Sequence, residues 1–228
     1  MVFTGSQTLA SGNNYFWLAY NISGSATPGN VVDATCTQFQ TSESELVRYP
    51  TVTDPAGSRT IIAPLSGTVT VGTGGTYPSL TGAGGLFATI NTAGLNGNLT
   101  ANIISDLTED GSNALNEWAE TPASSNFTLL IQSSAATERL IAGTVGDAMI
   151  RMNGADRVTV DGRVGGSGKY LRFRNSNTAN YVLSFLNGAA SNTFRNCFFE
   201  GANTSTGVVL FSTGNNRANT ILDSEIKN

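Results

Sequence analysis

The sequence predicts an all-β chain whose C-terminal part is a parallel β-solenoid. Two segments, 183–201 and 208–226, repeat the same order of short apolar strands and turns rich in Asn, Gly, Ser and Thr. Asn192 and Asn219 align at a spacing of 27 residues, and a weaker copy occupies 148–162. A unit of this length cannot bury its apolar face alone, so successive units must stack on one another.

The first 63 residues predict a partial β-sandwich. Clusters of turn residues, such as 11–14 and 54–57, separate runs rich in β-branched and aromatic residues. In the run 15–22 both alternating faces are largely apolar, which is expected of a central sandwich strand that is covered on two sides. The predicted strands are 2–3, 15–22, 31–39, 46–53 and 59–62.

A junction and a helix are predicted between the two modules. Pro64 and Gly67 break strand pairing, so we expect one domain over 1–63 and a second over 64–228. Pro78 suits the first position of a helix, and the apolar residues after it keep helical spacing at Leu80, Ala83, Phe87, Ile90 and Ala93. Such a helix would cover the open end of the solenoid.

A glycine-rich segment, Gly72-Thr-Gly-Gly75, precedes this helix. Consecutive backbone amides can bind phosphate, but the segment lacks the Lys and Ser/Thr of a P-loop. A tight turn is the better interpretation.

The composition argues against several classes of partner. Charged residues make up 12% of the chain and the net charge is −4, whereas nucleic-acid binding requires clustered cations. Arg172 and Arg174 come nearest to a patch, and we interpret them as a solvated outer strand face. No apolar run has the length of a membrane span, and the first residues do not resemble a signal peptide.

The two cysteines predict neither a metal site nor a favoured disulfide. Cys36 and Cys197 lie in different predicted domains, and their spacing fits no metal motif. A disulfide between them is possible, but we expect each to be a small buried apolar residue.

Two groups of carboxylates are candidate sites. Asp106, Glu109 and Asp110 could hold Ca²⁺ in a loop, although an ordinary acidic loop is the simpler interpretation and the spacing is not that of an EF-hand. Asp156, Asp161, Asp223 and Glu225 could supply a paired-carboxylate glycosidase.

Turn chemistry accounts for the second group more simply. Asp161 precedes a glycine, and Asp223 aligns with Asn196 of the previous repeat, where Asn and Asp tolerate left-handed geometry. The chain has no His, so no general base near neutral pH is ready-made. We therefore expect no catalytic, cofactor-binding or metal-binding residue.

Aromatic and β-branched residues at alternating positions predict stacked rows in the solenoid core. The exposed faces would then carry Ser, Thr and Asn, which suit weak multivalent contacts with glycans or other surfaces. The predicted core rows are Val158, Val160, Leu171, Phe173, Phe194, Phe198, Phe199, Ile221 and Ile226.

Two resemblances extend these predictions. The segments 5–22, 26–34 and 55–59, with the core Asn-Tyr-Phe-Trp-Leu-Ala-Tyr, resemble the second half of the β-sandwich module associated with bacterial BNR-repeat sialidases. That module is not the catalytic part, and it recurs in large surface proteins exported by the type IX secretion system. This chain lacks the first half of the module and any propeller Asp-box, so the resemblance does not imply sialidase activity.

The second resemblance covers the rest of the chain. The strand, turn and helix start in 67–80 resemble the N-terminal cap of right-handed parallel β-helices of the pectin-lyase-like superfamily, and the likeness continues through the coils to Asn228. Together the two resemblances imply an all-β fold, a partial β-sandwich followed by a right-handed parallel β-helix with an N-terminal capping helix.

These features lead to a functional expectation. We expect a structural or adhesive segment of a secreted bacterial cell-surface protein, a rigid β-helical rod located outside the cell. Its partners would be extracellular or cell-surface glycans or proteins, and other copies joined end to end through exposed strand edges. The alternative is a non-catalytic carbohydrate-binding accessory region of a polysaccharide-degrading enzyme. A lyase or hydrolase ranks last.

Overall fold

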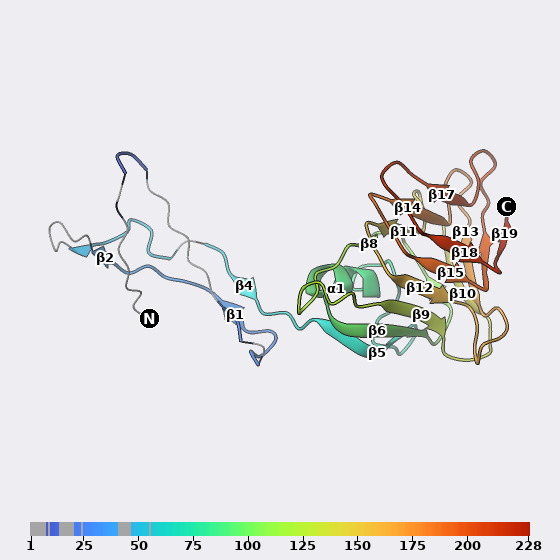
Figure 1. Cartoon of the computed structure of the whole chain (residues 1–228), viewed down its shortest axis with the longest axis horizontal. Helices are drawn as coiled ribbons and strands as arrows, with labels where there is room; N and C mark the ends of the chain where they lie inside the picture. Colours follow the sequence, from blue (N-terminus) through green and yellow to red (C-terminus); the bar gives the residue numbers. More distant parts are fainter. Residues whose placement is uncertain (1–7, 9, 14–20, 24, 41–46, 55) are drawn as a thin grey trace. The chain divides into compact units, whose positions relative to one another are not determined.

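The computed structural model describes the chain except for residues 1–7, 9, 14–20, 24, 41–46 and 55. The chain divides into two units, Met1–Ile61 and Ile62–Asn228 (Figure 1).

The first unit contains two short antiparallel strand pairs in its described part. β1 (Val31–Val32) pairs with β4 (Arg59–Thr60), and β2 (Phe39–Gln40) pairs with β3 (Val47–Arg48). β1, β3 and β4 fall within three of the predicted runs, and β2 begins at the last residue of the run 31–39 and extends one residue beyond it. The described strands do not form a sandwich, and the predicted central strand 15–22 lies outside the described residues except for its last two positions.

The second unit is a parallel β-solenoid, as the repeats predict. Each complete coil contributes one strand to each of three parallel sheets. The six-stranded sheet contains β5 (Leu65–Val71), β6 (Leu95–Ile103), β9 (Leu129–Ser133), β12 (Val158–Asp161), β15 (Thr193–Arg195) and β18 (Thr220–Leu222).

The other two sheets complete the coils, and they lie beside the first in Figure 1. The five-stranded sheet contains β7 (Leu107–Thr108), β10 (Arg139–Gly143), β13 (Leu171–Asn175), β16 (Cys197–Glu200) and β19 (Glu225–Lys227). The four-stranded sheet contains β8 (Leu115–Asn116), β11 (Ile150–Asn153), β14 (Leu183–Leu186) and β17 (Val209–Phe211).

The predicted register is confirmed. Thr193 pairs with Thr220 and Phe194 pairs with Ile221, so adjacent strands are offset by 27 residues. The weaker copy also stacks on the next coil, where Val160 pairs with Phe194. The coil is longer there because residues 162–170 separate β12 from β13, whereas Asn196 alone separates β15 from β16.

The corner between the six- and five-stranded sheets explains the Asn, Asp and Gly positions. Asn196 and Asp223 have φ angles of 52° and 50° at successive coils, as their alignment predicts. Gly162 follows β12 at the preceding coil, and a Cβ atom there would lie 1.8 Å from the carbonyl oxygen of Asn196. Only glycine fits that approach without movement of the backbone.

Aromatic side chains stack along the core. Phe173 and Phe199 are parallel with ring centroids 5.5 Å apart, and Phe194 packs edge-on against Phe199. The prediction for Phe198 was wrong. Its ring lies below the Arg172 guanidinium, 4.2 Å from the centroid, because strand alternation turns Phe198 outward when Phe199 turns inward.

The single helix of the described residues is α1 (Leu86–Ala93), which buries Leu86, Phe87 and Ile90. It lies in the predicted region but begins later than Pro78. The carboxylate of Glu109 accepts the backbone N–H groups of Leu80 and Thr81, at 2.8 and 2.7 Å, and so fixes a non-helical turn before the helix.

One boundary prediction needs correction, and one turn prediction agrees with the structure. β5 begins at Leu65 and contains Gly67, which lies at a register irregularity with a φ of 78° rather than ending the strand. Gly72 and Gly75 form the expected tight turn, closed by a 2.9 Å hydrogen bond from Gly75 N–H to the Gly72 carbonyl.

The last coil leaves core positions exposed. β17, β18 and β19 are the final strands of their sheets. Phe211 stacks on the buried Phe185 and Ile226 pairs with the buried Phe199, yet they are 54% and 51% exposed. This face is an unpartnered apolar surface in the described residues.

Candidate functional site

A polar groove of about 600 Å³ lies along the outer face of the four-stranded sheet. We call it the amide groove. It is lined by five asparagines (Asn91, Asn113, Asn116, Asn153 and Asn187), three serines (Ser112, Ser184 and Ser212), the pair Asp147 and Arg151, and Ala114, Leu186 and Leu210. Strand alternation turns Arg151 and Asn153 outward, because their neighbours Ile150 and Met152 are buried in the core.

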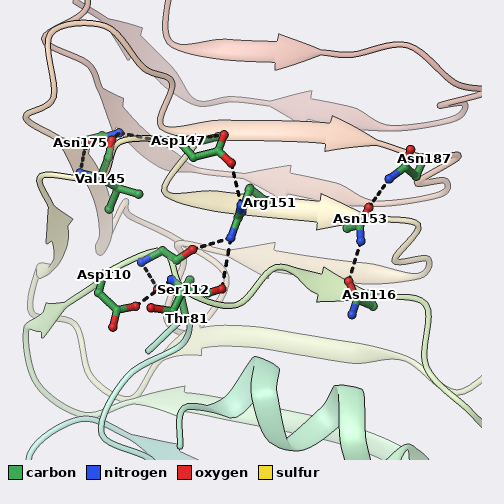
Figure 2. A network of polar contacts seen from close by, with 12 residues as sticks. Thr81, Asp110, Ser112, Asn116, Val145, Asp147, Arg151, Asn153, Asn175 and Asn187 are labelled. Atoms are coloured by element: carbon green, nitrogen blue, oxygen red, sulfur yellow. Dashed lines mark hydrogen bonds and ion pairs between the residues drawn. The ribbon is translucent and has the colours of Figure 1, made fainter. Parts of the chain in front are cut away.

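Three of the asparagines form a ladder across the coils (Figure 2). The Asn187 amide donates to Asn153 Oδ1 at 2.5 Å, and the Asn153 amide donates to Asn116 Oδ1 at 2.7 Å. In the described part of the chain, the Asn116 amide nitrogen and the Asn187 amide oxygen have no protein partner. Both ends of the ladder can therefore bind a ligand, one as a donor and the other as an acceptor.

Arg151 crosses the groove beside this ladder. Its Nη1 donates to Asp147 Oδ2 at 2.6 Å, and its Nη2 donates to the carbonyls of Gly111 and Ser112 at 2.5 and 3.4 Å (Figure 2). The Nε atom of Arg151 and the Oγ atom of Ser184 are buried, and neither has a hydrogen-bond partner in the described residues. Arg151 and Ser184 are paired positions on adjacent strands.

Residues 112–114 line one side of the groove, and hydrogen bonds hold the loop 109–113 in place. Glu109 also accepts the hydroxyl of Thr81 at 2.5 Å, and Thr81 Oγ in turn accepts the N–H of Gly111 at 3.0 Å. Burial raises the pKa of Glu109, and these hydrogen bonds only partly oppose that effect. On the helix side, Asn91 Oδ1 accepts the N–H of Asn116 at 2.9 Å, which ties α1 to β8.

The acidic loop does not assemble a calcium site. Glu109 turns inward, Asp110 accepts the Ser112 N–H, and Asp106 accepts the Leu140 N–H. In the described residues, no three Asp, Glu, Cys or His side chains come together in a way that could hold a metal. Each of the three carboxylates accepts a hydrogen bond from a backbone N–H group instead.

The other candidate carboxylates lie outside the amide groove. Asp161 bonds Arg163 and Arg195, whose hydrogen bonds outweigh the opposing effect of burial and lower its pKa. Asp156 accepts the Ala190 N–H, and Glu225 pairs with Lys169. Asp223 is the left-handed corner residue described above. Among the described lining residues the groove has one carboxylate, Asp147, whereas the paired mechanism requires two.

The two arginines interpreted as solvated are ion-paired. Arg172 bonds Glu138 and Glu200, and Arg174 bonds Glu200 at 2.8 Å. Burial alone would raise the pKa of Glu200, but hydrogen bonds from Lys227 and Arg174 and the charge of Arg172 lower it to about 2. The patch is therefore a cross-coil charge network, with few cationic groups left for a ligand.

The cysteines differ from each other. Both are free thiols, and Cys197 is buried as expected, with its pKa raised to about 12 chiefly by burial. The prediction for Cys36 was wrong, because Cys36 is exposed.

Comparisons with known proteins identify no relative. No protein-family model matches the chain, and no curated protein or solved structure shows detectable similarity to it. No helix in the described residues is long and apolar enough to span a membrane.

Sequence reasoning missed the amide groove. A signal was present, since an apolar residue followed by Asn-Gly closes both strands, at Met152-Asn153-Gly154 and Leu186-Asn187-Gly188. This pattern repeats at the coil spacing. It predicts a ladder only once the coils are in register, which is why the sequence predicted Asn in turns and on exposed faces but no particular groove.

Proposed function

We propose that the chain is a structural and adhesive segment of a secreted bacterial surface protein, in which a rigid β-helical body presents the amide groove to glycans. The observation that supports this proposal is the groove itself. Its asparagine ladder offers donors and acceptors on a sheet whose opposite face is packed into a continuous core. Amides and hydroxyls pair well with sugar hydroxyls, which both donate and accept.

The finer assignments belong to the same proposal. They are a right-handed pectin-lyase-like β-helix with α1 as its cap, a first unit derived from a BNR-associated β-sandwich, and export by the type IX system. The sequence motifs described above support them. The burial of Leu86, Phe87 and Ile90 against the solenoid core also supports the capping role of α1.

A second candidate uses the same groove. The chain would then be a non-catalytic carbohydrate-binding region of a polysaccharide-degrading enzyme. The groove supports both readings equally, and they differ in whether a catalytic module accompanies the chain. Binding of a glycan without its cleavage by this chain is expected in either case.

The test measures glycan binding by the whole 228-residue chain and by an Asn153→Ala variant. Removing Asn153 breaks the centre of the ladder, so affinity for soluble oligosaccharides should fall at least tenfold. Asn96→Ala changes an exposed asparagine on another sheet and should leave affinity unchanged. The proposal fails if no glycan binds, or if both variants bind as the wild type does.

A further inference from the structure

The charges of the amide groove are unevenly exposed. Arg151 and Asp147 are its only charged lining residues in the described part of the chain. The Arg151 side chain is 21% exposed, whereas the Asp147 side chain is 61% exposed. A ligand that enters the groove therefore meets a carboxylate before it meets the cation.

The cation is also already engaged. Recognition of a carboxylate by arginine uses two parallel N–H groups. Both terminal nitrogens of Arg151 are bonded to the protein, Nη1 to Asp147 and Nη2 to backbone carbonyls of the loop 109–113. Nε has no partner but is buried, and each bidentate fork of the guanidinium includes a terminal nitrogen, so a bidentate contact would compete with the bonds that hold the groove wall.

The remaining lining favours uncharged polar groups. The buried Oγ of Ser184 and Nε of Arg151 lie at paired positions of the floor and need a hydrogen-bond partner that the described residues do not supply. The amides and hydroxyls that line the groove can pair with ligand hydroxyls, which carry no charge. Leu186 and Leu210 add apolar surface against which the C–H face of a sugar can pack.

We infer that the Asp147–Arg151 pair makes the amide groove selective for uncharged, hydroxyl-rich chains over chains that carry carboxylates, an inference that rests on the proposed glycan binding. Asp147 is the specificity-determining residue. It repels an acidic chain and neutralises the cation that would otherwise attract one.

The experiment compares matched ligands on the full chain. The probes are β-1,4-glucan, β-1,4-mannan and α-1,4-glucan hexasaccharides, each with its C6-oxidised uronate counterpart, titrated calorimetrically at low ionic strength. The wild type should bind at least one neutral chain at least tenfold more tightly than its uronate counterpart. Asp147→Asn should reduce that ratio at least fivefold, because it exposes an uncompensated Arg151.

A control variant keeps the test specific. Asp223→Asn is the same chemical change at a corner where the preceding coil has Asn196, so it should fold normally and leave the ratio unchanged. Tighter binding of the uronate by the wild type, or an unchanged ratio in Asp147→Asn, overturns the inference while glycan binding itself stands. Failure of all six probes to bind defeats the proposed function and this inference with it.

Discussion

At the residue scale, Asn192 shows how one side chain locks successive coils together. It is fully buried, and its Oδ1 accepts the Val158 N–H at 2.9 Å while its Nδ2 donates to the Ala155 carbonyl and to Asn219. Asn219 repeats the arrangement one coil later by accepting the Asn192 N–H. The repeat identified from sequence is therefore a hydrogen-bond ladder.

Replacing Asn192 with Ala should lower the free energy of unfolding by about 2–3 kcal/mol, because buried backbone groups lose their partners. Asn219→Ala makes the same change at the partly exposed last coil, where water can replace the lost bonds, and should cost about 1 kcal/mol. Urea unfolding of both variants measures the difference. Equal costs would contradict a buried ladder.

The lowered pKa of Glu200 makes the free energy of unfolding depend on pH. Its pKa falls from 4.5 to about 2 in the folded protein, so the ionised form contributes stability above pH 4.5 that is lost as the pH falls toward 2. The free energy of unfolding of the wild type should exceed that of Glu200→Gln near neutral pH, and the gap should close between pH 4.5 and 2. A gap that stays constant over that range would show that the charge network does not act in this way.

At the element scale, helix α1 matters through its packing. Phe87 is buried in the core, and Asn91 bonds both β8 and the chain just before it. The sequence predicted a helix in this region because apolar residues keep helical spacing. It could not predict the late start, since the acceptor that holds the preceding turn, Glu109, is more than twenty residues away in the chain.

The Phe87→Ala variant should lose about 3–5 kcal/mol of stability through loss of buried contacts. It should also speed hydrogen exchange in β5 and β6, which the helix protects if it is a cap. Thr92→Ala alters the exposed side of the same helix and should change stability by less than about 0.5 kcal/mol. Unchanged exchange in β5 and β6 would count against the capping role.

At the scale of the whole molecule, the repeat predicted the solenoid well because register and core both follow from a period of strands and turns. The groove was harder to predict, because its residues come from four coils and α1. They form a groove only when the coils are stacked. The first unit has the fewest features from which its fold can be predicted. Its described strands are two residues long, and several apolar side chains, including Tyr49 and Val52, are exposed.

The exposed final coil predicts self-association. Phe211 and Ile226 occupy core positions without cover, and open strand edges recruit further strands. Light scattering should show a mass that rises with concentration, and the double change Phe211→Ser and Ile226→Ser should suppress the rise. The matched control, Tyr49→Ser with Val52→Ser, alters exposed apolar residues of the first unit. If only the control suppressed association, the final coil would not be the contact.

The parallel register is the claim on which every other inference depends, and nuclear Overhauser contacts in the 228-residue chain test it most directly. The account predicts contacts between Thr193 and Thr220 and between Phe194 and Ile221, each pair 27 residues apart. Close Hα–Hα contacts between neighbouring strands in 145–228, which mark antiparallel hairpins, would contradict it.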